Sequence, residues 1–124
     1  MKGPEQIVRE FCAAWSRRDP DELTSYFTDD GVYHNMPMDP LVGKEAIKGF
    51  LTGFLAGVTT AQFRILHLAV NGDVVLTERV DAFTLAGREG AFPVSGTFEL
   101  RDGKIAAWRD YFDMAQVTKF LTGG

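Results

Sequence analysis

The hydrophobic residues of this chain change their spacing once, near Thr59, and this change limits the folds that the chain can adopt. Before it, apolar residues recur every three or four positions, which is typical of helices that bury one face. After it, apolar and polar residues alternate in stretches separated by short glycine-containing segments, which is typical of β-hairpins. Helices followed by hairpin-linked strands predict an α+β fold, in which a curved sheet packs on N-terminal helices.

Three amphipathic helices are expected before the change of spacing. The first spans residues 4–18 and carries an apolar stripe made of Ile7, Val8, Phe11, Cys12 and Trp15. The second begins with Asp19 as its capping residue, followed by a proline in the first turn, and a stop signal follows it at residues 28–31. The third spans residues 43–55, where Ile47, Phe50, Leu51, Phe54 and Leu55 share one face.

Five strands are expected, of which the last four follow one another as an antiparallel meander. Their ranges are residues 32–36, 61–70, 74–85, 91–100 and 104–112. The connections between the last four are residues 71–73, 86–90 and 101–103, and a short closing helix is expected at 114–121. A curved sheet with helices in its concave face forms a cone, and a small apolar ligand would bind at the open end.

Composition excludes several classes of protein. A length of 124 residues fits one domain, residues 1–124. Thirteen basic residues against seventeen acidic ones give a net charge of −4 without any basic run, so we expect no nucleic-acid partner. There is no apolar run long enough for a membrane span or a signal peptide, so we expect no membrane partner and a cytoplasmic location. Cys12 is the only cysteine, so an internal disulfide is impossible.

Two of the expected strands carry charged residues on a face that should be buried. Alternation along residues 77–83 places Thr77, Arg79, Asp81 and Phe83 on one face and Glu78, Val80 and Ala82 on the other. On the last strand, Asp110 lies between two aromatic residues of the same face. If the two faces meet, two carboxylates and one guanidinium share an apolar pocket, where burial disfavours a charged carboxylate. Taken alone, an Arg–Asp pair of this kind is more often a structural ion pair.

Other catalytic arrangements find little support in the sequence. The only histidines are His34 and His67, and no carboxylates stand at a recognisable ligand spacing from them, so we expect no metal site. No Gly-x-Ser-x-Gly segment occurs, and Cys12 lies on the buried stripe of the first helix. A covalent nucleophile is therefore not expected either.

Three sequence strings carry a resemblance to a known family. They are Tyr33-His34-Asn35-Met36-Pro37, Thr77-Glu78-Arg79-Val80-Asp81 and Trp108-Arg109-Asp110-Tyr111-Phe112-Asp113. In this order, and over nearly the whole chain, they resemble the limonene-1,2-epoxide hydrolase family. The resemblance implies the cone-shaped, cystatin-like fold that this family shares with nuclear transport factor 2, ketosteroid isomerase and the SnoaL-like polyketide cyclases.

The resemblance also implies an activity and its residues. It implies an Asp–Arg–Asp triad at Asp81, Arg79 and Asp110, with Tyr33 and Asn35 holding a water molecule. Opening an epoxide with water needs one protonated and one ionised carboxyl, and we assign these as Asp81 and Asp110. The expected reaction is a cofactor-free hydrolysis of a small apolar epoxide by water, giving a vicinal diol. The expected substrate pocket is lined by Met36, Met38, Leu51, Phe54, Phe83, Phe98, Trp108 and Phe112.

Two other functions remain open from the sequence. An isomerase or cyclase of the ketosteroid-isomerase or polyketide-cyclase kind would use one carboxylate as a base, but it gives Arg79 no evident use. In a non-catalytic ligand-binding or dimerisation module, Tyr33 would be a core aromatic residue and Asn35 a turn residue. The mixed outer face made of Glu78, Val80 and Ala82 predicts a homodimer formed through that face of the sheet.

Overall fold

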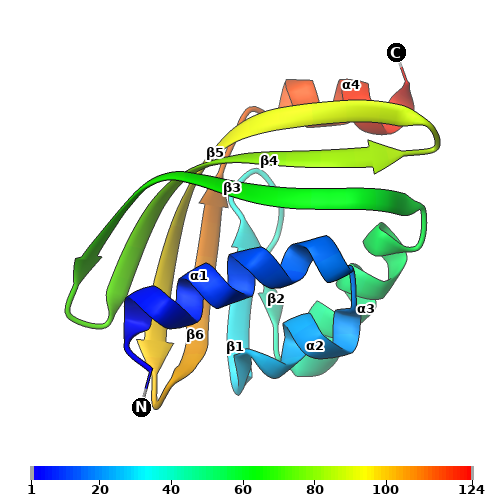
Figure 1. Cartoon of the computed structure of the whole chain (residues 1–124). Helices are drawn as coiled ribbons and strands as arrows, with labels where there is room; N and C mark the ends of the chain where they lie inside the picture. Colours follow the sequence, from blue (N-terminus) through cyan, green and yellow to red (C-terminus); the bar gives the residue numbers. More distant parts are fainter. Residues whose placement is uncertain (1, 124) are drawn as a thin grey trace.

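A curved sheet dominates residues 2–123, the part of the chain that the computed structural model describes (Figure 1). Its six strands lie in the order β2-β1-β6-β5-β4-β3, and β1 pairs with β6 in parallel while the other pairs are antiparallel. The strands are β1 (Phe27–Asn35), β2 (Leu41–Val42), β3 (Val58–Asn71), β4 (Val74–Leu85), β5 (Arg88–Arg101) and β6 (Lys104–Tyr111). The predicted α+β fold and the meander of the last four strands are confirmed.

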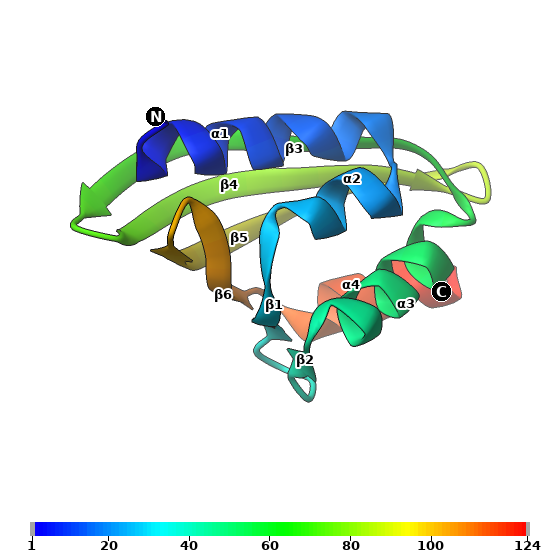
Figure 2. The ribbon, with the colours of Figure 1, turned by 90° about the horizontal axis from the view of Figure 1, so that it is seen from below.

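The helices pack on one side of this sheet (Figure 2). They are α1 (Pro4–Ala14), the 3-10 turn η1 (Trp15–Arg17), α2 (Pro20–Ser25), α3 (Lys44–Leu55) and α4 (Met114–Thr122). Helix α1 is shorter than predicted, because η1 tightens its last turn and Arg18 then adopts a left-handed conformation with φ of 53°. Among the described residues, no helix is long and apolar enough to cross a membrane.

All three hairpins have tighter turns than the sequence pattern predicted, and two of them share the same backbone conformation. Ala86 and Gly87 have φ values of 52° and 78°, and Asp102 and Gly103 have the same pair of values. Two consecutive positive φ values are typical of a two-residue turn that matches the twist of the paired strands. The five-residue loop predicted at 86–90 is therefore wrong, and β5 begins at Arg88 instead of residue 91.

The predicted strand at residues 32–36 is wrong at its start, because β1 begins at Phe27. Phe27 is buried and pairs with Ile105 of β6, which keeps the chain extended through the Asp-Asp-Gly segment. The register with β6 shifts between Phe27 and Val32, so the predicted stop signal forms an irregularity inside the strand. The two-residue strand β2 was not predicted, because two residues cannot display alternation.

An aromatic core fills one end of the cone. Phe11 of α1 lies edge-on to Trp108 with ring centroids 5.0 Å apart, and to Phe98 at 6.1 Å. Both partners are fully buried, as is Phe11 itself. The polar residues singled out from the sequence lie directly beside this core, because the guanidinium carbon of Arg79 is 5.9 Å from the Phe98 ring and 5.8 Å from the Trp108 ring.

Candidate active site

The two carboxylates singled out from the sequence are held by one guanidinium. Arg79 donates from Nε to Asp81 Oδ1 at 3.0 Å and from Nη2 to Asp81 Oδ2 at 2.8 Å. It also donates from Nη1 to Asp110 Oδ1 at 3.2 Å and from Nη2 to Asp110 Oδ2 at 2.7 Å. The three residues Arg79, Asp81 and Asp110 are only 1%, 5% and 4% exposed. The structure therefore brings both carboxylates into one buried cluster.

Every N–H group of this guanidinium has an acceptor. The fifth bond runs from Nη1 to the hydroxyl of Thr77 at 3.1 Å, and Thr77 in turn donates to the Gly96 carbonyl at 3.3 Å. The guanidinium carbon also lies 4.8 Å from the ring centroid of Phe63. An ammonium group offers three donors without a planar fork, so lysine could not make this set of bonds.

Gly96 makes this geometry possible, and its role was not predicted from the sequence. Strand β5 runs between β4 and β6, and on it Gly96 pairs with both Thr77 and Asp110. A Cβ atom at this position would collide with Nη1 of Arg79 and lie 2.6 Å from Asp110 Oδ1. The missing side chain therefore leaves the space through which the guanidinium of one strand reaches the carboxylate of another.

Burial raises the pKa of both carboxylates, but the two groups have different hydrogen-bond donors. Burial raises the pKa of Asp81 to about 6, against the effect of Arg79 and with the help of the charge on Asp110. Burial also raises the pKa of Asp110 above its ordinary value, while Arg79 and the Trp108 indole act to lower it. The indole Nε1 donates to Asp110 Oδ1 at 2.6 Å. This extra donor favours the charged form of Asp110.

Tyr33 and Asn35 approach the cluster from β1. Because β1 is parallel to β6, Tyr33 lies opposite Trp108 and Asn35 lies opposite Asp110. The Tyr33 ring stacks on Trp108 with centroids 4.2 Å apart, and burial raises the pKa of its hydroxyl above the ordinary value. Both side chains line the cavity that contains Asp81 and Asp110. Four of the five polar residues thus line this cavity, and Arg79 is buried in contact with both carboxylates.

This cavity has a volume of about 170 Å³, and its lining agrees with half of the predicted pocket. Met38, Phe54, Phe83 and Phe112 line it, whereas Met36, Leu51, Phe98 and Trp108 do not. Phe98, Trp108 and Leu51 are fully buried, the first two against α1 and the third on the core stripe of α3. Met36 lies in the turn after β1, and alternation points it away from Asn35.

Several lining residues were not predicted because they come from distant segments. They are Trp15, Phe50, Phe63, Phe92, Val94, Met114, Val117 and Leu121. Phe50 lies on the same helix face as the predicted Phe54, and Phe63 lies opposite Asp81 on the neighbouring strand. Their apolar character was the only signal in the sequence that could have placed them in the pocket. The contribution of α4 depends on how that helix folds back over the sheet, which no local pattern specifies.

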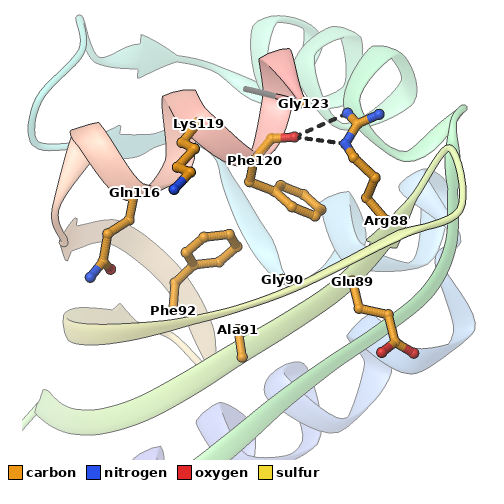
Figure 3. Close-up of a pocket in the computed structure, with 9 residues that line it drawn as sticks. All are labelled: Arg88, Glu89, Gly90, Ala91, Phe92, Gln116, Lys119, Phe120 and Gly123. Carbon is orange, nitrogen blue, oxygen red and sulfur yellow. Dashed lines mark hydrogen bonds between the residues drawn. The ribbon is translucent and has the colours of Figure 1, made fainter.

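A separate groove of about 380 Å³ lies between the start of β5 and α4 (Figure 3). In it, Arg88 donates to the Phe120 carbonyl at 3.0 and 3.3 Å, and the Phe120 ring meets Phe92 edge-on at 5.2 Å. These contacts hold α4 against β5 of the sheet. None of the five polar residues lines this groove, and among residues 2–123 no group of three metal-binding side chains occurs.

Comparison with known proteins gives consistent matches. Residues 8–108 match the model of the SnoaL-like domain family. Epoxide hydrolase EphG of Mycobacterium tuberculosis is 33% identical over 117 residues, which cover 94% of this chain and 78% of that protein. The solved structure of an M. tuberculosis LEH-like epoxide hydrolase is 33% identical, with a TM-score of 0.82 over 96% of this chain and 89% of that one.

A more distant structure shares the fold. A SnoaL-like polyketide cyclase from Shewanella denitrificans, described as putative, has a TM-score of 0.86 with 19% identity, covering 98% of each chain. Identity at this level shows the shared fold alone.

We predict that Gly96→Ala disrupts the Arg79 cluster, because the added methyl group takes the space of the guanidinium. The free energy of unfolding should fall by about 1–3 kcal/mol, the usual cost of overpacking, as measured by urea denaturation. Gly49→Ala is the matched control, because a Cβ at Gly49 meets nothing within 4 Å and alanine favours a helix. A Gly96→Ala variant as stable as the wild type would contradict this account of the glycine.

Stability should also depend on pH through Asp81. Its pKa is higher in the folded protein than in the unfolded chain, so the folded state binds more protons between about pH 4 and 6. The wild type should therefore lose stability relative to Asp81→Asn as the pH rises through this window. Urea denaturation of both proteins at pH 4.5 and pH 7.5 measures the difference. A difference that is the same at both pH values would show that the Asp81 pKa is not raised.

Proposed function

Because this chain belongs to the SnoaL-like domain family and is a homologue of an LEH-like epoxide hydrolase, we propose that it is a cofactor-free epoxide hydrolase. In this proposal the substrate is a small apolar epoxide, and water opens it to a vicinal diol. The residues that act are Asp81, Arg79, Asp110, Tyr33 and Asn35.

The observation that carries this proposal is the shared guanidinium at the base of an apolar cavity. Asp81 and Asp110 both line the cavity, and both bind Arg79 through two hydrogen bonds. Two buried carboxylates beside one cation keep one proton more readily than two separate carboxylates would. The cluster can therefore supply an acid and a base at the same pH, as the addition of water to an epoxide requires.

Asp81 is proposed as the general acid and Asp110 as the general base. Asp81 transfers its proton to the epoxide oxygen while the carbon–oxygen bond breaks. Asp110 takes a proton from the attacking water while the water oxygen bonds to carbon. The cycle closes when the proton on Asp110 returns to Asp81. The hydrogen bond from the Trp108 indole supports this assignment, because it stabilises the ionised form of Asp110.

Tyr33 and Asn35 are proposed to position the water. Asn35 lies opposite Asp110 in the β1–β6 pair, and its amide can both donate to and accept from a water molecule. Tyr33 presents a hydroxyl group from the same face of β1, and its raised pKa keeps that group protonated. A water bound by both side chains and Asp110 would be held close to an epoxide carbon in a reactive orientation.

The direct test is turnover of a panel of terpene, styrene and cyclohexene epoxides, followed by detection of diol. Asp81→Asn and Asp110→Asn should nearly abolish turnover, and Arg79→Lys should be almost as damaging, because each breaks the proton transfer. Tyr33→Phe and Asn35→Ala should lose roughly a hundredfold, the usual effect of one positioning group. Circular dichroism of each variant serves as the control that the protein is folded. A folded wild type that opens none of these epoxides would refute the proposal.

The same assay in ¹⁸O-labelled water separates direct attack from an ester route. With enzyme in excess, direct attack places the label in the diol during the first turnover. An ester on Asp81 or Asp110 would give an unlabelled first diol and leave the label in the protein. Mass spectrometry of the diol and of the peptides with both residues distinguishes the two routes, and labelled Asp would contradict the acid–base scheme.

We also propose that the protein forms a homodimer through the outer face of the sheet. On this face Leu76 of β4 and Tyr111 of β6 are 49% and 48% exposed. Val80 and Ala82 extend the apolar surface along β4, while Glu78 and the Glu99–Arg109 ion pair give it polar groups of both signs. An apolar face with polar groups of both signs suits a symmetric contact with a second copy.

Analytical ultracentrifugation at micromolar concentration tests this dimer. We expect the wild type to sediment as a dimer and Leu76→Asp as a monomer, because the new carboxylate would be buried in the contact. Val42→Asp is the control, because Val42 is 64% exposed but lies on the short edge strand β2. A monomeric wild type would refute the proposed dimer.

A further inference from the structure

One wall of the candidate active-site cavity consists of aromatic rings in mutual contact. Phe50 meets Tyr33 edge-on at a centroid distance of 5.8 Å and lies parallel to Phe54 at 6.1 Å. Phe54 meets Phe83 edge-on at 5.2 Å, and Phe83 meets Phe63 edge-on at 6.1 Å. All five rings line the cavity. We call Tyr33, Phe50, Phe54, Phe63 and Phe83 the aromatic wall.

The other lining residues are chemically mixed, because Trp15, Phe92 and Phe112 are aromatic and the remaining apolar ones are aliphatic or contain sulfur. Helix α4 contributes Met114, Val117 and Leu121, and β5 contributes Val94. Aliphatic and thioether side chains adapt to many shapes, whereas aromatic rings present fixed faces and edges. The aromatic wall, with Trp15 stacked on Phe63 at 4.3 Å, can therefore distinguish one apolar ring from another.

The volume of the cavity matches the size of one six-membered ring. An apolar protein cavity of about 150 Å³ is large enough to bind benzene. At about 170 Å³, this cavity holds one six-membered ring together with a small attached group. Asp81 and Asp110 lie on its lining, so a ring against the aromatic wall leaves the attached group beside the carboxylates.

We propose that the substrate is an epoxide with a single aryl ring, and that the aromatic wall selects it over a saturated ring of the same size. This inference rests on the proposed epoxide hydrolase activity and specifies its substrate class. Aromatic rings gain from edge-to-face and offset contacts beyond the burial of apolar area. A saturated ring gains from burial alone, and with more hydrogen atoms it exposes at least as much apolar area to water. Burial by itself would therefore not favour the aryl substrate.

The test compares benzyloxirane with (cyclohexylmethyl)oxirane. In both, a methylene group separates the ring from the epoxide, so the ring does not conjugate with the reacting carbon. We expect kcat/KM of the wild type to favour the aryl compound by about fivefold, the effect of one or two aromatic contacts. Equal rates, or a preference for the saturated compound, would overturn the inference.

Variants of the wall connect this preference to the residues. Phe54→Leu removes the ring that contacts both Phe50 and Phe83, so it should reduce the aryl preference at least twofold. Phe50→Leu serves the same purpose if Phe54→Leu does not fold. Tyr26→Leu is the control, because this ring packs edge-on against Phe11 at 5.3 Å and does not line the cavity. A preference unchanged in a folded wall variant would show that the wall does not select the ring.

Binding of unreactive compounds separates this inference from the proposed activity. Calorimetry with propylbenzene and propylcyclohexane measures the ring preference without any reaction. Tighter binding of propylbenzene by a protein that opens no epoxide would refute the hydrolase proposal and leave the selection of an aryl ring standing. Turnover of both oxiranes at equal rates, with equal binding of both hydrocarbons, would refute the selection and leave the hydrolase proposal standing.

Discussion

A buried guanidinium that binds two carboxylates is the interaction on which the rest of this structure depends. Removing these charges from water costs several kcal/mol for each ion, and only well-placed partners can offset that cost. Here all five N–H groups of Arg79 have acceptors, and Asp110 has a further donor in Trp108. Loss of either carboxylate would leave an incompletely paired charge in the core, so stability and the proposed chemistry depend on the same bonds.

The sheet topology is what brings these groups together. Arg79 and Asp81 belong to β4 and Asp110 to β6, so the intervening β5 has to leave space at Gly96. The parallel pairing of β1 with β6 then places Asn35 opposite Asp110. Hairpin-linked strands alone would give an antiparallel sheet without this neighbour. The crossover through β1 is therefore what adds the proposed water-binding side chains to the charged cluster.

Local patterns predicted the fold class and the polar residues because both leave a signal in neighbouring positions. Alternation along β4 separates the buried Thr77, Arg79 and Asp81 from the exposed Glu78, and the structure confirms that separation. The same reasoning fails where turns replace alternation, as at β1, which begins five residues before the predicted strand, and at β5, which begins three residues before it. The pocket was only half predicted, because a buried aromatic residue has the same pattern whether it lines a cavity or fills the core.

The sequence by itself determined the order of the helices and the longer strands, and the face of β4 and β6 on which each charged side chain lies, because these depend on residues close together in the chain. Tertiary structure decided which faces meet. Only the packed sheet shows that Gly96 admits the guanidinium, that the Trp108 indole binds Asp110 instead of lining the cavity, and that α4 contributes to the cavity lining. These features depend on strand order, register and the return of the last helix, which are set by contacts between residues far apart in the sequence.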